Sequence, residues 1–311
     1  MKIIFFGSDD FAAVHLEHLL GFGHQLLACV TGPDKPQGRG MKVVISPIKE
    51  IALEKKIPCL QPLSLKTKDI VDVLKSYEAD IFVVVAYGRL LTQEILDIPK
   101  MFCMNVHGSL LPKYRGAAPV NWAILNGDKE TGVTLQKMIL ALDAGDIIAQ
   151  SIISIDDNEN AAQLRKRMAQ VGAQFLIKVL EQHPSGQFSV ISQDEALVTY
   201  APKLTKEMGR IDWNKPAQAI INQVRGLQPW PGAHTLYKGK ILKVTQAQIT
   251  TEGKGDFIPG EVSHVDKNGF YVACGDKILL IKELQPEAGK VMSAVSFVAG
   301  YKIARGSVLG G

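Results

Sequence analysis

Six consecutive apolar residues, IFVVVA at positions 81–86, constrain the fold of this chain more than any other sequence feature. A strand with one face in water alternates apolar and polar side chains, so an unbroken β-branched run predicts a strand covered on both faces. Similar runs occur at 2–6, 26–30 and 102–106, and stretches with helical spacing separate them. This alternation predicts an α/β fold with a mostly parallel sheet and helices on both faces.

The pattern changes towards the C-terminus and predicts two domains. We assign the α/β domain to residues 1–182, where a long amphipathic helix is expected over 161–180. Residues 183–209 are polar and irregular, as expected for a linker. Over 210–311, short apolar runs separated by turns such as Asn-Gly and Gly-Asp predict a small β-barrel or sandwich.

Composition and charge narrow the function classes. The chain is 46% hydrophobic and 21% charged, which excludes a disordered chain. No apolar run approaches the roughly 20 residues of a membrane helix, and the N-terminal MKIIFFG lacks the pattern of a signal peptide. We therefore expect a cytoplasmic protein with no membrane partner.

Positive charge is concentrated in the C-terminal domain. Residues 1–206 carry 22 basic and 22 acidic residues, whereas residues 207–311 carry 13 and 9. This excess favours a polyanionic partner, although a solvated lysine-rich face gives the same count. A second basic segment, PDKPQGRGMK at 33–42, predicts either a mobile phosphate-binding loop or an ordinary surface loop.

The sequence gives no sign of a metal site. The four cysteines lack C-x-x-C spacing, so we expect free, mostly buried thiols and no cysteine-based zinc site. They are Cys29, Cys59, Cys103 and Cys274. His15 and His18 are three residues apart on a predicted helix, but no third ligand is evident, and we expect them to flank a solvent-facing side.

The first strand-to-helix junction does not fit a dinucleotide site. It is Gly7-Ser8-Asp9-Asp10-Phe11, which is not G-x-G-x-x-G. Two carboxylates stand where a pyrophosphate would bind, so dinucleotide binding is disfavoured.

Three residues form a candidate site for acyl chemistry. Asn105 and His107 lie two apart in NVHGSLLP at a predicted strand end, so they share one face. An amide donor can hold a developing oxyanion, and an imidazole can carry a proton. Asp143, in the loop LDAGD, could orient His107 or relay a proton. The alternatives are polar groups that satisfy nearby backbone and a carboxylate that forms an ordinary turn.

These motifs resemble those of the methionyl-tRNA formyltransferases, a branch of the 10-formyltetrahydrofolate-dependent formyltransferase family. The resemblance covers essentially the whole chain. It rests on IIFFGSDDFA (3–12), PDKPQGRGMK (33–42), VVVAYGRLL (83–91), NVHGSLLPKYRGAAP (105–119), ETGVTLQKM (130–138), LDAGDI (142–147) and PWPGAH (229–234). It implies a Rossmann-like catalytic domain, residues 1–182, followed by an OB-like β-barrel that binds tRNA, residues 210–311.

The resemblance also implies roles for individual residues. Asn105, His107 and Asp143 correspond to the catalytic residues, and Lys35, Arg39 and Lys42 lie in the loop expected to contact tRNA. The residues expected to form the folate pocket are Tyr87, Gly88, Arg89, Ser109, Leu110, Leu111 and Pro112. The implied co-substrate is 10-formyltetrahydrofolate, without a metal, and the implied partner is initiator methionyl-tRNA. A monomer is expected.

Three alternatives remain open. A formyltransferase acting on a nucleotide-linked amino sugar would share NVHGSLLP and LDAGD but does not need the basic loop. A purine-pathway formyltransferase would leave about 100 C-terminal residues unexplained. An RNA-binding protein on a former enzyme fold should have lost Asn105, His107 or Asp143, and all three are present. One departure from the family pattern is Asp9, where a proline is usual.

Overall fold

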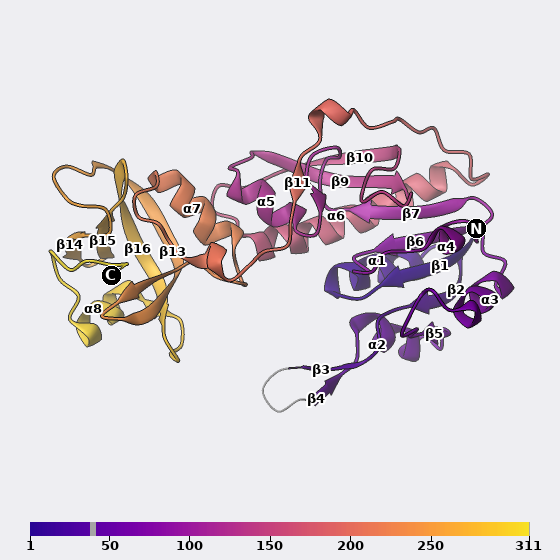
Figure 1. Ribbon diagram of the computed structural model, residues 1–311, viewed down its shortest axis with the longest axis horizontal. Coiled ribbons are helices and arrows are strands. Elements are labelled where there is room, and N and C mark those ends of the chain that lie inside the picture. Colours follow the sequence, from indigo (N-terminus) through magenta and orange to yellow (C-terminus); the bar gives the residue numbers. More distant parts are fainter. Residues whose placement is uncertain (38–41, 311) are drawn as a thin grey trace. The chain divides into compact units, whose positions relative to one another are not determined.

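The computed structural model describes residues 1–37 and 42–310, and these form two compact units (Figure 1). The first unit contains Met1–Pro119, Glu130–Ser154 and Arg165–Ala201. The second contains Val120–Lys129, Ile155–Leu164 and Pro202–Gly311. Two short stretches from the middle of the chain therefore pack with the C-terminal residues.

The first unit is built on a seven-stranded sheet of order β10-β9-β7-β6-β1-β2-β5. Five of its strands are parallel to their neighbours, while β9 runs antiparallel to β7 and β10 antiparallel to β9. In chain order the strands are β1 (Lys2–Gly7), β2 (Gln25–Val30), β5 (Cys59–Leu60), β6 (Ile81–Val85), β7 (Phe102–His107), β9 (Glu130–Lys137) and β10 (Ile147–Ser154). The apolar run at 81–86 forms β6, which is buried throughout. The predicted mostly parallel sheet is confirmed.

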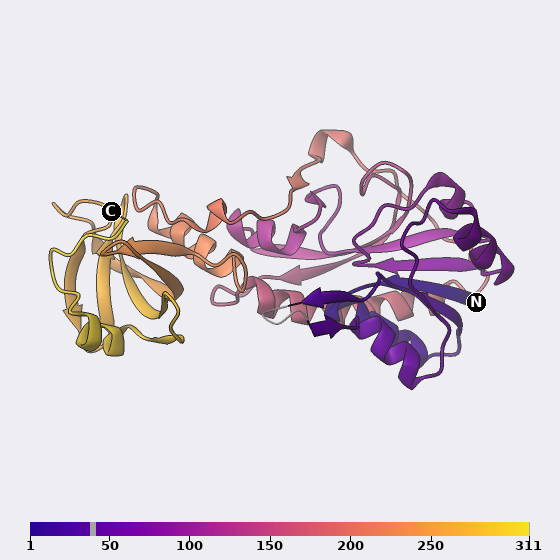
Figure 2. The same ribbon diagram turned by 60° about the horizontal axis from the view of Figure 1, so that its bottom comes forward.

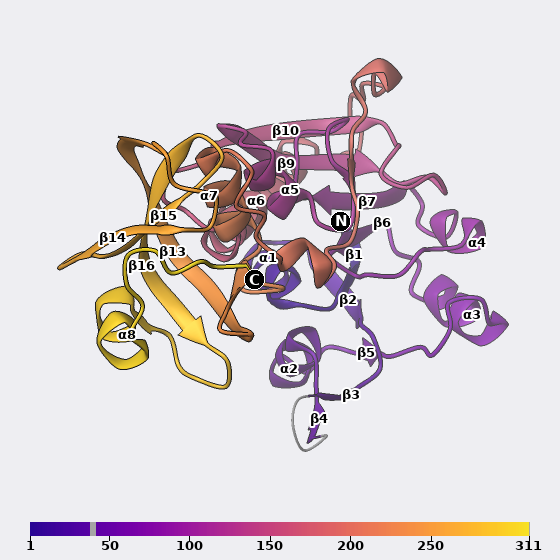
Figure 3. The ribbon, with the colours of Figure 1, turned by 60° about the vertical axis from the view of Figure 1, so that its left-hand side comes forward.

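Helices cover both faces of this sheet, as the sequence predicted. Figure 3 shows α3 and α4 on one side and α1, α2 and α6 on the other. The helices of this layer are α1 (Asp10–Leu20), α2 (Pro47–Glu54), α3 (Lys68–Ser76), α4 (Gln93–Leu96) and α6 (Ala161–Gln182). Asp9 caps α1 by accepting the Ala12 N–H at 3.1 Å, and it pairs with Arg165 at 2.5 Å. That carboxylate therefore has a structural role at the junction.

The second unit is a small antiparallel β-domain. Its sheet has the order β12-β13-β16-β15-β14, with β17 paired to β16. The strands are β12 (His234–Tyr237), β13 (Lys240–Gly253), β14 (Val262–Asp266), β15 (Gly269–Ala273), β16 (Lys277–Pro286) and β17 (Met292–Ser293). Figure 2 shows them as a strongly curved sheet. Helices α7 (Ala217–Gly226) and α8 (Ala294–Tyr301) pack on it around buried Trp213, Phe270 and Phe297. The predicted OB-like domain is confirmed.

Several segments are more regular than their sequences suggested. Part of the basic loop is a hairpin, in which β3 (Lys35–Gln37) pairs with β4 (Lys42–Val44). The polar stretch after residue 182 contributes β11 (Tyr200–Ala201), which pairs in parallel with β8 (Arg115–Gly116). Short 3₁₀ turns at Glu195–Leu197 and Glu207–Gly209 flank β11, and α5 covers Pro119–Leu125. In the described parts of the chain, no helix has the length and apolar character needed to cross a membrane.

The expected position of His15 on a solvent-facing side is wrong. Its side chain is fully buried, because the face of α1 that carries it packs beneath α6 near Gly172. Its Nδ1 lies 2.8 Å from the Phe11 carbonyl, and its buried Nε2 has no hydrogen-bond partner among the described residues. Burial lowers the pKa of His15 to about 4. No group of three metal-ligating side chains occurs in the described residues.

Acidification should destabilise the fold through His15. The folded state has a pKa of about 4 at this group, against 6.5 when it is exposed, so the unfolded state takes up the proton first. The stabilisation is complete above pH 6.5 and is lost as the pH falls towards 4. We expect a loss of about 2 kcal/mol between pH 7.5 and pH 5, measured by urea unfolding.

His18→Leu is the matched control, because His18 lies on the same helix and makes the same 2.8 Å contact to a carbonyl four residues earlier, but is partly exposed. His15→Leu should reduce the pH-dependent loss, whereas His18→Leu should retain it. An equal loss in both variants would contradict the assignment.

Candidate active site

The candidate site begins at the carboxyl end of β7. Asn105 is half-buried and His107 is 6% exposed, and their spacing places both side chains on one face of the sheet. In the antiparallel pairing, Asn105 stands opposite Gln136 of β9 and His107 opposite Thr134. The two strands thus supply a row of four polar side chains.

The hydrogen bonds of His107 define which ring nitrogen is available. Nε2 lies 2.9 Å from the carbonyl oxygen of Tyr114. A carbonyl only accepts, so Nε2 carries a proton and donates it. Nδ1 is therefore the nitrogen that is bare in the neutral ring and that takes up a proton in the charged ring, and it lies 3.6 Å from Oδ1 of Asp143. That distance is too long for a hydrogen bond, so Nδ1 remains available to a ligand, as an acceptor in the neutral ring and as a donor in the protonated ring.

Asp143 is held in a fixed orientation by two donors. Its Oδ2 accepts the Gly116 N–H at 2.9 Å, and its Oδ1 accepts Nε2 of Gln136 at 3.1 Å. The residue lies between β9 and β10 with φ of +49°, in the left-handed region. The structure therefore brings the carboxylate to His107, although 36 residues separate them in the sequence.

The tightness of the loop around Asp143 depends on Gly145. A Cβ at this position would lie 1.6 Å from the carbonyl oxygen of Lys137. No side chain fits there without displacing the backbone that carries Asp143. Glycine after the carboxylate is thus a packing requirement of the site.

A second set of residues, missed by the sequence analysis, fastens this loop from outside. Nε2 of Gln193 donates to the carbonyl oxygens of Asp143 and Gly145 at 2.8 and 2.7 Å. Arg115, 4% exposed, donates to Oε1 of Gln193 at 2.9 Å and to Glu195 at 2.7 Å. The stretch expected to be a linker therefore supports the catalytic candidate. In the sequence, this supporting role is signalled only by two long polar side chains, Gln193 and Glu195, in a polar segment.

The expected folate residues at the end of β6 differ in their contacts, which are apolar for Tyr87 and polar for Arg89. Tyr87 is 4% exposed and packs edge-on against Phe6, with ring centroids 5.4 Å apart. Gly88 has φ of +75°. The Arg89 guanidinium donates to the carbonyl oxygens of Pro62 and Leu63 at 2.7 and 2.9 Å, which ties this strand end to the segment that follows β5.

The loop after His107 is internally bonded. Ser109 is fully buried and its Oγ donates to the Lys113 carbonyl at 2.6 Å. Leu111 is buried, and its N–H donates to Oγ1 of Thr134 at 3.1 Å. Leu110 packs against Gly132, and a cis peptide bond joins Leu111 to Pro112. These contacts hold the loop against β9.

The basic segment is described only in part. The backbone of Lys35 lies on β3 and that of Lys42 on β4, whereas Arg39 lies outside the described residues. Before the hairpin, Asp34 accepts hydrogen bonds from Lys49 and, at 2.7 Å, from Gln61. These bonds hold the pKa of Asp34 below its usual value. The base of the hairpin is thereby anchored.

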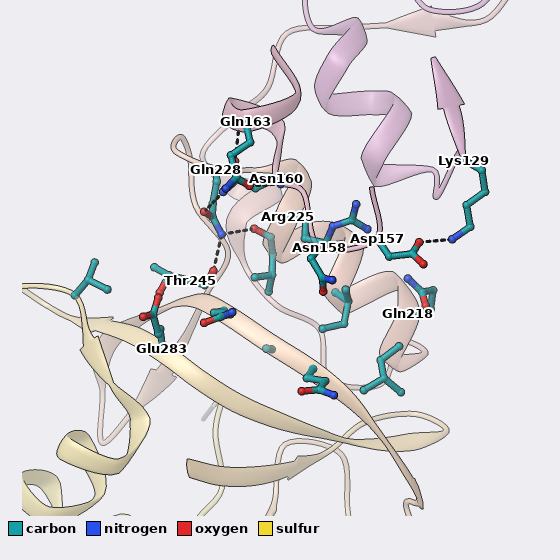
Figure 4. Close-up of a pocket in the computed structure, with 17 residues that line it drawn as sticks. Lys129, Asp157, Asn158, Asn160, Gln163, Gln218, Arg225, Gln228, Thr245 and Glu283 are labelled. Atoms are coloured by element: carbon teal, nitrogen blue, oxygen red, sulfur yellow. Dashed lines mark hydrogen bonds and ion pairs between the residues drawn. The ribbon is translucent and has the colours of Figure 1, made fainter. Parts of the chain in front are cut away.

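A separate cavity of about 680 Å³ lies within the second unit (Figure 4). Its labelled lining is mostly polar and includes Asn158, Gln218 and Gln228. Arg225 also lines it, with its guanidinium donating to the carbonyl oxygens of Glu159 and Asp156. None of the candidate catalytic residues borders this cavity.

The chain is similar to known proteins along its whole length. Residues 1–180 match the family model described as formyl transferase, and residues 203–302 match the formyl transferase C-terminal domain. A methionyl-tRNA formyltransferase of Geotalea uraniireducens is 45% identical over 310 residues, covering 100% of this chain and 98% of that protein. One from Caldanaerobacter subterraneus is 44% identical, covering 99% and 100%.

Two solved structures share the fold. The N-formyltransferase from Helicobacter canadensis, in complex with folinic acid and dTDP-3-aminofucose, has a TM-score of 0.66 at 21% identity and covers 90% of this chain and 99% of that one. HypX from Aquifex aeolicus, in complex with tetrahydrofolic acid, has a TM-score of 0.65 at 18% identity and covers 97% and 47%. At these identities the likeness extends to the fold alone.

Removing the Gln193 side chain should loosen the Asp143 loop. Gln193→Ala deletes two hydrogen bonds to backbone carbonyls and one partner of buried Arg115, so we expect the free energy of unfolding to fall by about 2 kcal/mol. Urea unfolding measures this change. Gln187→Ala, at an exposed position in the same segment, should change little. Equal free energies of unfolding for the two variants would show that the contacts of Gln193 do not stabilise the fold.

Proposed function

The chain belongs to the methionyl-tRNA formyltransferases of the formyl transferase family, and from this we propose that it formylates methionine on initiator tRNA. The formyl donor is a folate, which we take to be 10-formyltetrahydrofolate. The acceptor is the α-amino group of the esterified methionine, and the product is N-formylmethionyl-tRNA for translation initiation. We place the reaction in the cytoplasm, where translation uses its product, and we expect a monomer.

Three exposed leucines adjoin candidate residues, either in sequence or through a hydrogen bond to the backbone. Leu63, Leu90 and Leu142 are 84%, 76% and 54% exposed. Each belongs to a segment that carries or contacts a candidate residue, because Arg89 bonds the Leu63 carbonyl and precedes Leu90, and Leu142 precedes Asp143. Exposed apolar side chains beside a few fixed polar groups suit a flat heterocycle. We infer that Tyr87, Gly88, Arg89 and the 109–112 loop shape this pocket.

The availability of Nδ1 on His107 supports the following mechanism. The methionine amine attacks the formyl carbon, and the carbonyl oxygen becomes an oxyanion. Asn105 donates an N–H to that oxygen, and His107, when protonated, donates from Nδ1. Preorganised donors of this kind each contribute about 10²–10³ in rate. The pairing of Nε2 with the Tyr114 carbonyl keeps Nδ1 directed to the reacting atoms.

Collapse of the tetrahedral intermediate requires two proton movements. The attacking nitrogen loses a proton, and N10 of the folate gains one as its bond to the formyl carbon breaks. Asp143 accepts the proton of the attacking nitrogen, directly or through water, and then delivers it to N10 as the bond to the formyl carbon breaks. Its carboxylate is already oriented by Gly116 and Gln136, so little reorganisation is needed at the moment of transfer.

A sugar formyltransferase is the second candidate, because solved structures with this fold include one in complex with dTDP-3-aminofucose. That likeness is at 21% identity, whereas the tRNA enzymes are 44–45% identical over the whole chain. The positive excess in residues 207–311 also suits a polyanionic acceptor. The tRNA substrate is therefore better supported.

Purified protein should formylate methionyl-initiator tRNA in the presence of 10-formyltetrahydrofolate. Asn105→Ala should lower turnover about 10²–10³-fold and His107→Ala at least as much, because each removes an oxyanion donor. Acid-stable formylmethionine on the tRNA is the readout. A dTDP-linked amino sugar, offered as the competing acceptor, should not be formylated. Parental turnover in Asn105→Ala would refute its assigned role.

Affinity for tRNA should fall steeply with salt. Arg39, in the basic segment, is expected to neutralise one phosphate, so Arg39→Ala should reduce the slope of log affinity against log salt by about 1. Filter binding at 50–300 mM salt measures it. Lys55→Ala, whose ammonium is already paired with Glu54, is the control and should leave the slope unchanged. A slope equal to that of the parent in Arg39→Ala would remove Arg39 from the interface.

A further inference from the structure

Gln136 is a polar residue at the site whose full hydrogen-bonding capacity the mechanism does not use. It lies on β9 between the buried side chain of Leu135 and exposed Lys137, and it is itself only 2% exposed. Its Nε2 donates to Oδ1 of Asp143 at 3.1 Å. That atom of Asp143 is also the one that faces Nδ1 of His107. Gln136 therefore controls the carboxylate oxygen nearest the imidazole.

The other end of the same amide is unsatisfied. Oε1 of Gln136 is buried and has no hydrogen-bond partner among the described residues. Leaving a buried acceptor unpaired destabilises a fold, because the group has lost water and gained no partner. Such a group in a native fold calls for an explanation, and a ligand-dependent partner is one.

Asn105, which lies opposite Gln136 on the neighbouring strand, has a side-chain amide that can donate to such an acceptor. Asn105 is the direct partner of Gln136 in the antiparallel β7–β9 pairing, so their side chains project from the same face with Cβ atoms roughly 5 Å apart. No described residue makes a hydrogen bond with the Asn105 side chain. An amide that lacks fixed partners can present either its oxygen or its nitrogen to a ligand.

We propose that Gln136 is a positioning residue that orients the Asn105 amide when substrates bind. Its Oε1 accepts one N–H of Asn105, so the second N–H of that amide points at the formyl oxygen. The same side chain, through Nε2, keeps Asp143 in place. This inference rests on the proposed oxyanion role of Asn105. It involves no covalent step and no proton transfer by Gln136.

Orientation matters because the wrong rotamer reverses the electrostatics. With its nitrogen towards the formyl oxygen, Asn105 stabilises the developing negative charge. With its oxygen there, it repels that charge. A buried acceptor placed directly across the strand pair selects the first arrangement before the reaction starts, which is the condition for effective oxyanion stabilisation.

The test compares turnover in Gln136→Met and in the parent. Methionine keeps the length and volume of the side chain but removes both polar groups. We expect kcat for formylation of methionyl-tRNA to fall at least tenfold, because the variant loses both the acceptor for Asn105 and the 3.1 Å donor to Asp143. KM for both substrates should stay within about twofold, because substrate contacts are unchanged. Gln25→Met, at an exposed position on β2 of the same sheet, is the control.

A double-mutant cycle separates orientation from packing. Asn105→Ala should cost about 10²–10³ in kcat in the parent and clearly less in the Gln136→Met background, because the Asn105 amide is no longer oriented there. Gln136→Glu keeps an acceptor for Asn105 but replaces the donor to Asp143 with a second carboxylate oxygen, which lowers kcat by itself. The cost of Asn105→Ala is therefore measured within this background, where it should remain large. Equal costs in all three backgrounds would overturn the proposal. Gln136→Ala replaces the methionine variant if the latter does not fold.

These outcomes distinguish the two levels of inference. If Asn105→Ala keeps parental turnover, the proposed catalytic role of Asn105 fails. If Asn105→Ala loses activity while Gln136→Met stays within about twofold of the parent, only the positioning role of Gln136 fails.

Discussion

The antiparallel pairing of β9 with β7 is the constraint on which the site depends. In a wholly parallel sheet, the next strand along would need a helical crossover and would approach β7 with a different hydrogen-bond pattern. Here β9 pairs antiparallel with β7, so Gln136 and Thr134 stand opposite Asn105 and His107. The loop that leaves β9 then brings Asp143 back to the same strand end.

Around this strand pair, the site is fixed mainly by backbone groups. The Tyr114 carbonyl fixes the His107 ring, the Gly116 N–H fixes Asp143, and Gln193 holds two carbonyls of the Asp143 loop. Backbone groups in packed loops move less than long side chains. The reactive groups that they orient therefore lose little conformational entropy when substrate binds. Besides the Asp143 carboxylate, the ion pair between Arg115 and Glu195 supports the loop through Gln193.

Much of this could be predicted from sequence, because it depends on local periodicity. The apolar run of β6 and the helical spacing of α6 gave correct elements, and NVHGSLLP with LDAGD located Asn105, His107 and Asp143. Gln193 could not be predicted, because its partners lie about 50 residues away in the sequence. His15 was misplaced because helical spacing alone does not say which face is covered. Helix α8 was missed because AVSFVAGY is apolar almost throughout and lacks a polar face.

The division of the chain into units determines whether either unit can be produced or exchanged as one continuous stretch of sequence. The backbone passes from one unit to the other after residues 119, 129, 154, 164 and 201. Within the second unit, the Asn121 amide donates to the Gly226 carbonyl, and Arg225 donates to the carbonyls of Glu159 and Asp156. The C-terminal residues thus complete their fold with stretches encoded far upstream. A gene cut after residue 201 would leave the second unit without two of its three segments. Exchange of the second unit between proteins therefore requires all three segments to be transferred together.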